Sequence, residues 1–469
     1  MHYERIVMPM EAKNERLYRL LFKKRSRHLS ATRIIALVFL GIILLGAVLL
    51  CLPAASRSGE SCGFLPALFT ATSATCVTGL TRFDTFTQFN GFGQTVIITL
   101  IQVGGLGFMS IATMVVFLLR RKVGLKQRMV MAQSLSVSDM AGVVRLQKWV
   151  LVGSFSIEGI GALILTLRFL PTYGFGTALK WGVFHSISAF CNAGFDLFGE
   201  LSPGSSLVPF QSDPVVLLTL TALVIIGGLG FLVWQDVILN RRFKKLTVYT
   251  RLVLMTTGSL LIIGTVMTAL TEWNNPDSIG NLSTGDKLLN CFFQSVTWRT
   301  AGFFSFDQAG MTDAGKAVGI MLMLVGGSSG STAGGIKTVT VLVLILFIIA
   351  RARGKNSVCV FKRTIPSGQV LDAMTVAVLV AVLSVIGAIF ISVTSGVTFI
   401  DSWYESASAL ATVGITAGAT GALTVAGQIM IILFMYFGRV GILTISLGFL
   451  MGSRAEERFR YAETNLMIG

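Results

Sequence analysis

The stretch FTATSATCVTGLTRFD (69–84) decides the fold, because degenerate copies of it recur three times along the chain. The copies read FHSISAFCNAGFDLFG (184–199), FQSVTWRTAGFFSFDQ (293–308) and YESASALATVGITAGA (404–419). The four stretches align on Gly79, Gly194, Gly302 and Gly414, which we call the aligned glycines. In every copy the residue ten positions earlier is aromatic, namely Phe69, Phe184, Phe292 and Tyr404. Each copy therefore joins a short apolar segment to a turn of small residues that ends in glycine.

A second motif follows each stretch inside the next apolar run. It reads GGLGF (104–108), GGLGF (227–231), GGSSG (326–330) and GRVGI (438–442). Two motifs in the same order four times indicate an internal repeat. We interpret the unit as a helix, a pore loop and a second helix (M1–pore loop–M2).

The apolar runs have the length that a membrane requires, since a hydrocarbon core of ~30 Å needs roughly 20 apolar residues. Runs of this kind lie at 34–52, 94–119, 149–170, 214–238, 252–271, 315–350, 371–394 and 425–451. The chain is 53% hydrophobic and only 13% charged, whereas soluble domains carry about 25% charged residues. We predict an all-α integral membrane protein in which eight transmembrane helices form four M1–pore loop–M2 repeats around a central ion pore.

The formal net charge of +16 fits the positive-inside rule rather than nucleic-acid binding. Most Lys and Arg residues fall in the two tails and in every second loop. This asymmetry predicts a multi-pass protein of the cell membrane with both termini in the cytoplasm. The basic leader precedes a full-length apolar run without a small-residue cleavage site, so we expect an uncleaved first span. The opposite, outward side holds Arg57, Arg82, Arg168, Lys180, Lys287, Arg299 and Lys316.

The predicted organisation follows from these assignments. It comprises a basic tail (1–33), repeat 1 (34–119, pore loop 62–84), a linker (120–148), repeat 2 (149–239, pore loop 180–199), a linker (240–251), repeat 3 (252–350, pore loop 287–307), a linker (351–370), repeat 4 (371–451, pore loop 402–418) and a C-terminal tail (452–469).

Four re-entrant loops at membrane depth must line an aqueous cavity or be buried by protein, so we expect them to converge on one axis. Rings of backbone carbonyls from such loops can replace the hydration shell of K⁺. Glycine removes the Cβ atom and permits the φ values that turn carbonyls inward. The candidate K⁺-binding filter residues are Val77, Thr78, Gly79, Asn192, Ala193, Gly194, Thr300, Ala301, Gly302, Thr412, Val413 and Gly414. Helix packing is the alternative for any single glycine, and we keep it for GGLGF at 104–108 and 227–231.

Ten consecutive small residues interrupt the sixth apolar run, and we call them the small-residue loop. They are Gly326, Gly327, Ser328, Ser329, Gly330, Ser331, Thr332, Ala333, Gly334 and Gly335. Each glycine disfavours a helix by about 1 kcal/mol, so we predict an intramembrane loop beneath the filter that acts as a gate. A small-residue packing face is the alternative. Lys337 ends the loop, about 20 Å along a helix from Arg351, which argues against snorkelling to the cytoplasm.

Arg439 occupies the position that Gly105, Gly228 and Gly327 hold in the other repeats. A guanidinium at mid-membrane almost always faces the bundle interior or a cavity. Below a cation filter it would oppose passage and donate to loop carbonyls, so we assign it to the gate; a buried structural pair is the alternative. Glu158 also lies inside a span, where it pairs with an arginine or lines the cytoplasmic vestibule.

On these residues the chain resembles the Trk/Ktr/HKT superfamily of K⁺ transporters. The resemblance rests on CVTG, CNAG, RTAG and ATVG in the loops, on GGSSGSTAGGIKT (326–338) and on Arg439. One span precedes the first pore loop, so the KtrB-type membrane subunit is the most similar. The resemblance implies K⁺ uptake, Na⁺ activation, a homodimer to which 461–469 contributes, and gating by a cytoplasmic RCK-type (KtrA-like) nucleotide-binding ring. No cofactor is expected on this chain itself, with K⁺ as substrate, Na⁺ as activator and membrane lipids as surroundings.

Other functions remain open at this point. An alternating-access Na⁺/K⁺ or H⁺/K⁺ symporter would use broken helices around a midplane site. The channel-like subunit of a K⁺-pumping ATPase would need more spans. The sequence contains no constellation of catalytic residues that would indicate a membrane enzyme.

Overall fold

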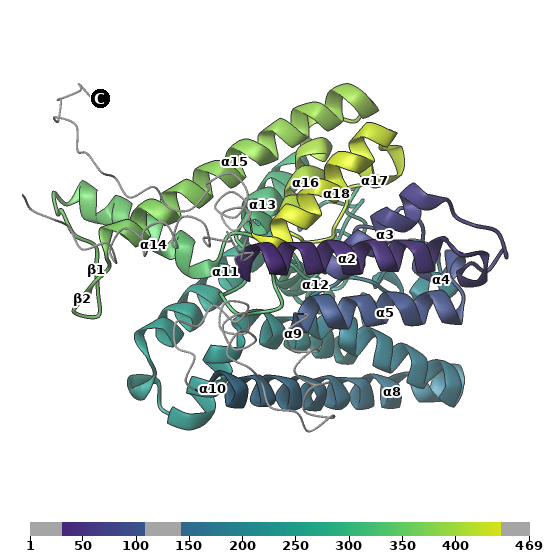
Figure 1. Ribbon diagram of the computed structural model, residues 1–469, viewed down its shortest axis with the longest axis horizontal. Coiled ribbons are helices and arrows are strands. Elements are labelled where there is room, and N and C mark those ends of the chain that lie inside the picture. Colours follow the sequence, from purple (N-terminus) through teal and green to yellow (C-terminus); the bar gives the residue numbers. More distant parts are fainter. Residues whose placement is uncertain (1–30, 108–141, 442–469) are drawn as a thin grey trace, which may run out of the picture.

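The computed structural model describes residues 31–107 and 142–441, and the regular structure in these residues is almost entirely helical (Figure 1). Two short strands, β1 (Cys359–Val360) and β2 (Arg363–Thr364), form an antiparallel hairpin in the predicted linker 351–370. The N-terminal tail, the linker 120–148 and the C-terminal tail lie largely or wholly outside the described residues, so they stay predictions.

Repeat 1 has the predicted order of a long helix, a pore helix and a second helix. These are α2 (Ala31–Cys51), α3 (Phe64–Cys76) and α5 (Gly91–Leu106), with the short η1 (Pro53–Ala55) and α4 (Thr85–Gln88) between them. Asn90 begins α5 because its side chain accepts from the N–H groups of Phe92 and Gly93. The helix ends at Gly107, which has φ of 80°.

In repeat 2, α8 (Val143–Phe190) contains both M1 and the pore helix, with non-helical backbone only at Gly174 (φ 74°). The sequence predicted two separate segments here, and the structure joins them at a kink. The second helix is divided into α9 (Pro214–Leu229) and α10 (Phe231–Asn240), which meet at an angle of 95°. Short turns of 3₁₀ helix complete the repeat: η2 (Phe198–Glu200), η3 (Val208–Phe210) and η4 (Phe243–Lys245).

Repeats 3 and 4 follow the same order. Repeat 3 consists of α11 (Val248–Glu272), the pore helix α12 (Thr284–Thr297), α13 (Asp313–Leu324) and α14 (Thr338–Ala352). Repeat 4 consists of α15 (Ser367–Ser395), the pore helix α16 (Phe399–Leu410), α17 (Ala419–Ala422) and α18 (Val425–Val440). The small-residue loop lies between α13 and α14 and is not helical, as its glycine content predicted.

In repeats 1, 2 and 4 the first glycine of the second motif packs M2 against its own pore helix. A Cβ atom on Gly104 would overlap the carbonyl oxygen of Thr75, and one on Gly227 would overlap that of Phe190. Gly438 meets the carbonyl of Leu410 in the same way. The packing interpretation of GGLGF is thereby confirmed for Gly104 and Gly227, because only glycine allows so close an approach.

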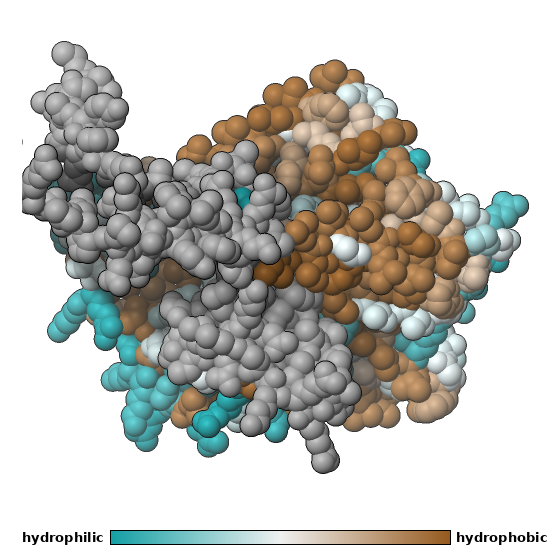
Figure 2. Space-filling model, in the orientation of Figure 1, coloured by the Kyte–Doolittle hydropathy of each residue, from teal (hydrophilic) through white to brown (hydrophobic). Residues whose placement is uncertain are grey.

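Large apolar areas lie on the face of the bundle that Figure 2 shows, as a membrane protein requires. Leu270 on α11 and Val393 on α15 are 74% and 80% exposed, respectively. Within the described residues, α2, α8, α11 and α15 are long and apolar enough to cross a membrane, and the bent pair α9–α10 makes a fifth if it is one span. The other second helices are shorter or broken, so the count of eight spans stays a prediction.

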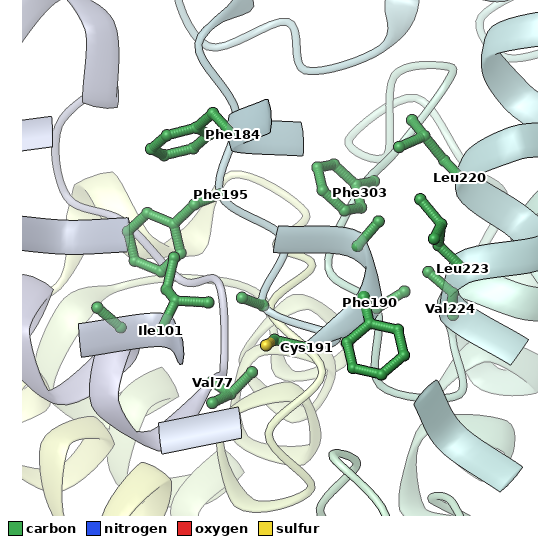
Figure 3. Close-up of a cluster of buried hydrophobic side chains, with 14 of the residues drawn as sticks. Val77, Ile101, Phe184, Phe190, Cys191, Phe195, Leu220, Leu223, Val224 and Phe303 are labelled. Atoms are coloured by element: carbon green, nitrogen blue, oxygen red, sulfur yellow. The ribbon is translucent and has the colours of Figure 1, made fainter. Parts of the chain in front are cut away.

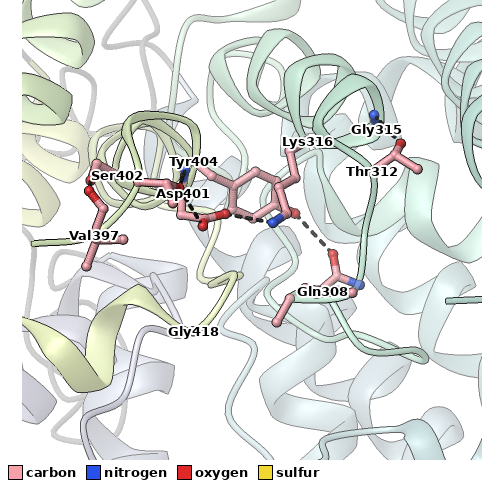
Figure 4. A network of polar contacts seen from close by, with 12 residues as sticks. Gln308, Thr312, Gly315, Lys316, Val397, Asp401, Ser402, Tyr404 and Gly418 are labelled. Atoms are coloured by element: carbon pink, nitrogen blue, oxygen red, sulfur yellow. Dashed lines mark hydrogen bonds and ion pairs between the residues drawn. The ribbon is translucent and has the colours of Figure 1, made fainter. Parts of the chain in front are cut away.

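Two kinds of contact hold the repeats together around the pore helices. Buried apolar side chains from the first three repeats, including Val77, Phe195 and Phe303, pack next to the pore loops (Figure 3). Polar contacts join repeats 3 and 4, where Lys316 pairs with Asp401 at 2.7 Å (Figure 4). The Tyr404 hydroxyl in the same network donates to the Gln308 side-chain oxygen at 3.0 Å.

Candidate ion-conduction site

The four aligned glycines, which belong to four different repeats, lie against one another. A Cβ atom on Gly79 would lie 3.2 Å from the Cα of Gly414 and 3.3 Å from that of Gly194. A Cβ atom on Gly194 would lie 2.5 Å from the Cα of Gly302, and one on Gly302 would lie 2.9 Å from the Val413 carbonyl oxygen. The contacts therefore run from repeat 1 through repeats 2 and 3 to repeat 4 and back. No side chain larger than hydrogen fits at these positions without moving a neighbouring backbone.

The backbone of the four loops follows one path. In each loop the aligned glycine has φ between 70° and 104°. The residue two positions before it is also left-handed, although it is not glycine: Val77 (57°), Asn192 (61°), Thr300 (74°) and Thr412 (54°). Left-handed backbone costs an L-residue roughly 1–2 kcal/mol, so four such residues at equivalent positions indicate a conformation that the site requires. The four loops therefore share one backbone conformation at equivalent positions.

Hydroxyl groups near the ends of the pore helices fix these loops, and the sequence analysis did not identify them. Ser73 Oγ accepts from the N–H of Gly79, and Ser408 Oγ accepts from that of Gly414, both at 3.0 Å. In repeat 2, Ser188 Oγ donates to the Phe195 carbonyl at 2.7 Å, and Thr297 makes the corresponding bond to Phe303. A signal was present, because a serine stands six residues before the aligned glycine in three repeats.

Three threonine hydroxyls in the pore loops have no protein partner. In the part of the chain that the structure describes, the Oγ1 atoms of Thr75, Thr78 and Thr412 are buried and make no hydrogen bond. Thr78 and Thr412 were both predicted as filter residues. Buried polar atoms are normally satisfied, so these hydroxyls are suited to water or to a desolvated cation.

The small-residue loop touches the candidate filter residues directly. Thr332 Oγ1 donates to the side-chain oxygen of Asn192 at 3.2 Å, and Asn192 Nδ2 donates to Thr300 Oγ1 at 3.4 Å. A Cβ atom on Gly334 would overlap Thr412 Oγ1. Lys337 Nζ donates to the Ala333 carbonyl at 2.8 Å, so its amino group is held by the loop.

Arg439 joins the loop to repeats 1 and 4. From α18, its guanidinium donates to the carbonyl oxygen of Thr332 and to that of Gly104, and at 3.1 Å to that of Gly105. The partners are carbonyl groups, and the described residues contain no carboxylate paired with Arg439. The sequence-based expectation that this arginine donates to a loop carbonyl is confirmed for Thr332. Among the residues that the structure describes, no carboxylate forms the buried ion pair that was the alternative.

Arg299 lies inside the protein and not on the surface, where the sequence analysis placed it among the outward-side cations. We counted it among the outward-side cations, but its side chain is buried and donates to the Gly326 carbonyl at 3.1 Å and to Thr338 Oγ1 at 3.2 Å. These partners are the first residue of the small-residue loop and the first residue of α14, which follows it. The error arose because the end of a pore helix lies deep in the protein even when its loop opens outward. The sequence did contain an indication of this position. The other repeats have Cys76, Cys191 and Ala411 where the third repeat has Arg299.

Glu158 is buried in α8, and its partner is an amide rather than an arginine. Gln102 Nε2 donates to both of its carboxylate oxygens at 3.0 Å. The Cys191 thiol, next to Asn192, lies 4.0 Å from the same carboxylate. Glu158 therefore lies next to the candidate filter segment of repeat 2.

Two carboxylates, Asp84 and Asp196, follow the candidate filter residues of repeats 1 and 2 in the chain. Asp196 accepts from the N–H of Phe198 at 3.1 Å. Burial raises the pKa of Asp196 to about 7, and the neighbouring Asp84 carboxylate adds to the rise. The charge of Asp196 consequently changes near neutral pH.

Comparison with known proteins agrees with this geometry. The TrkH family model, described as a cation transport protein, matches residues 30–458. The chain is 41% identical over 457 residues to the potassium/sodium uptake protein NtpJ of Enterococcus hirae, which covers 96% of this chain and 100% of that protein. It is 41% identical over 437 residues to the Ktr system potassium uptake protein B of Bacillus subtilis, and the match covers 93% of this chain and 96% of that protein.

The fold is similar to a solved structure as well. The crystal structure of the potassium transporter TrkH from Vibrio parahaemolyticus matches 91% of this chain and 86% of that chain with a TM-score of 0.71. Its sequence identity is 17%, so this match supports the fold alone. The resemblance inferred from the pore-loop motifs is confirmed: the chain belongs to the TrkH family of cation transport proteins.

Proposed function

We propose that this chain takes up K⁺ through a channel-like pore whose selectivity filter consists of the twelve candidate filter residues. The contact of the four aligned glycines is the observation that carries the proposal, because carbonyl rings from four converging loops suit a dehydrated K⁺ ion. The relatives named as potassium uptake proteins support K⁺ as the substrate. Measuring K⁺ and Na⁺ flux in liposomes that contain the purified chain tests it, and equal permeation of both ions would refute it.

The small-residue loop and Arg439 act as the gate of this pore. The loop contacts Asn192 and lies against Thr412, so it occupies the region next to the filter. Arg439 fixes the Thr332 carbonyl and brings a positive charge to the same region. Shortening the loop tests this role, because flux per protein should rise while the K⁺/Na⁺ ratio stays constant.

The chain works in the cell membrane as a homodimer, with both termini in the cytoplasm and with an RCK-type (KtrA-like) nucleotide-binding ring as regulator. The words "Ktr system" and "protein B" in the name of a relative support a separate component. The name "potassium/sodium uptake protein" of another relative supports a role for Na⁺, which we assign as activator. Flux with and without the cytoplasmic component and with and without Na⁺ tests both assignments.

An alternating-access symporter is the second candidate, favoured by the 95° bend between α9 and α10 and by the break between α13 and α14. Broken helices of this kind form ion sites in transporters. The two functions differ in coupling: a symporter moves K⁺ and the driving ion in a fixed ratio, whereas a channel conducts K⁺ alone down its gradient.

A further inference from the structure

The small-residue loop is bound to repeat 2 by a set of contacts that neither the filter nor Arg439 explains. The backbone N–H of Ser328 donates to the Gly228 carbonyl at 3.1 Å, and Ser328 Oγ donates to the carbonyls of Gly228 and Leu229. In the opposite direction, the N–H of Phe231 donates to the Gly330 carbonyl at 2.9 Å. The loop and the bend between α9 and α10 are thus paired through donors and acceptors on both sides.

The bend supplies these groups because it interrupts a helix. The last carbonyls of α9 and the first N–H groups of α10 have no partners within their own helices. Gly230, with φ of 92°, permits the sharp turn between them. The loop therefore completes the hydrogen bonding of the bend, and each structure stabilises the other.

A third contact comes from the start of α11. The Tyr249 hydroxyl donates to the Ser329 carbonyl at 3.2 Å. Tyr249 is connected to α10, because the Asp236 carboxylate accepts from the N–H and the hydroxyl of Thr247, the residue that caps α11, at 2.9 and 2.8 Å. The end of α10, η4 and the start of α11 therefore form one unit that holds the tip of the loop.

We propose that the α9–α10 bend and Tyr249 form a latch that keeps the small-residue loop in its closed position. Ser328 and Tyr249 are positioning residues, since they act on the ion through the loop. The inference rests on the proposed role of the loop as a gate. The exposed basic residues Arg241 and Arg242 directly follow α10, so a movement of this segment would reach the loop through the latch.

Two conservative substitutions test the latch in the full chain reconstituted in liposomes. Tyr249→Phe removes only the hydroxyl that reaches Ser329, and Ser328→Ala removes only the hydroxyl that reaches the bend. Losing one such bond should shift the equilibrium between closed and open loop by about two- to tenfold. K⁺ flux per protein should rise by that factor, with an unchanged K⁺/Na⁺ ratio.

Matched controls remove equivalent hydrogen bonds away from the loop. Tyr436→Phe removes a hydroxyl that donates to the Ala36 carbonyl at 2.8 Å, and Ser392→Ala removes one on α15 that donates to the Val397 carbonyl at 3.0 Å. Both controls should leave flux at the level of the unmodified chain. A purely structural role of the latch residues would instead lower the melting temperature without raising flux, which would overturn the latch.

A variant with a shortened 326–335 loop separates the latch from the gate itself. If the shortened loop raises flux but Tyr249→Phe and Ser328→Ala do not, the latch is refuted and the gate stands. If flux rises in none of the three, both inferences fail. Should Ser328→Ala prevent folding, Tyr249→Phe decides the question, because its benzene ring keeps the packing of the original side chain.

Discussion

Replacing Gly79 by alanine adds one methyl group at a position that has no space for it. The new Cβ atom would lie 2.6 Å from the carbonyl oxygen of Ala193, and contacts below 3.0 Å force a neighbouring atom to move. The φ value of 104° adds roughly 1–2 kcal/mol of strain for an L-residue. Overpacking of a tightly packed site costs about 1–3 kcal/mol, so we expect the free energy of unfolding to fall by about 2–5 kcal/mol.

The displaced oxygen belongs to Ala193, a predicted filter residue, and its shift is the reason to expect an effect on selectivity. The oxygen has to move from 2.6 Å to at least 3.0 Å from the methyl group, which changes the carbonyl ring. If the ring loses about 1.4 kcal/mol of preference for K⁺ over Na⁺, the ratio of their fluxes falls about tenfold. Flux of both ions into liposomes, normalised to protein, measures this ratio, and Gly79→Ser should act in the same direction.

Two control substitutions separate strain from contact. Gly396 also has a left-handed φ, of 67°, but a Cβ atom there would meet nothing within 4 Å. Gly396→Ala should therefore lower stability by the strain alone and leave selectivity unchanged. Gly258 has open space and no positive φ, so Gly258→Ala gives the baseline. Equal K⁺/Na⁺ ratios in Gly79→Ala and Gly396→Ala would refute the assignment of Gly79 to the filter.

Further predictions concern Arg439, Asp196 and the C-terminal segment. Arg439→Ala should raise K⁺ flux per protein, because it removes a charge that costs a cation 4 Å away roughly 1–4 kcal/mol. When it is combined with a shortened 326–335 loop, the increase in flux should be smaller than the two separate increases predict if both form one barrier. A lower normalised flux in Arg439→Ala would contradict the gate. Raising the external pH through about 7 should increase K⁺ uptake, because Asp196 then gains its negative charge, and Asp196→Asn should abolish that step. Deleting 461–469, which lies outside the described residues, should shift cross-linked dimer toward monomer; an undiminished dimer band would count against a dimer contact there.

The aligned glycines could be predicted from the sequence because the lack of space at these positions permits only one residue type. A Cβ atom at any of them meets the backbone of another repeat, and only glycine escapes that contact. The same reasoning predicted the break between α13 and α14, since ten small residues have little reason to form a helix. Both features restrict the residue types at their positions, so the sequence alone reveals them.

Other features depend on which elements meet in space, and the sequence did not reveal them. The bend at Gly230 was not predicted, because GGLGF fits close helix packing equally well and Gly227 does pack in that way. In three copies of the second motif the fourth residue has positive φ, at Gly107, Gly230 and Gly441. The buried position of Arg299 depends on the depth of its pore helix, which charge counting along a chain does not measure.

Arg299 and Arg439 explain why four repeats in one chain suit a gate of the kind that we propose. Both occupy positions where the other repeats have small residues, and both donate to carbonyls at the small-residue loop or at its ends. In an assembly of four identical subunits, either arginine would occur four times around the axis, and their mutual repulsion would be large at membrane depth. A single chain can instead keep the glycine contacts nearly fourfold and place one charge at Arg299 and one at Arg439. The proposed filter would then retain the symmetry that carbonyl rings require, while the small-residue loop is held by contacts that exist only once.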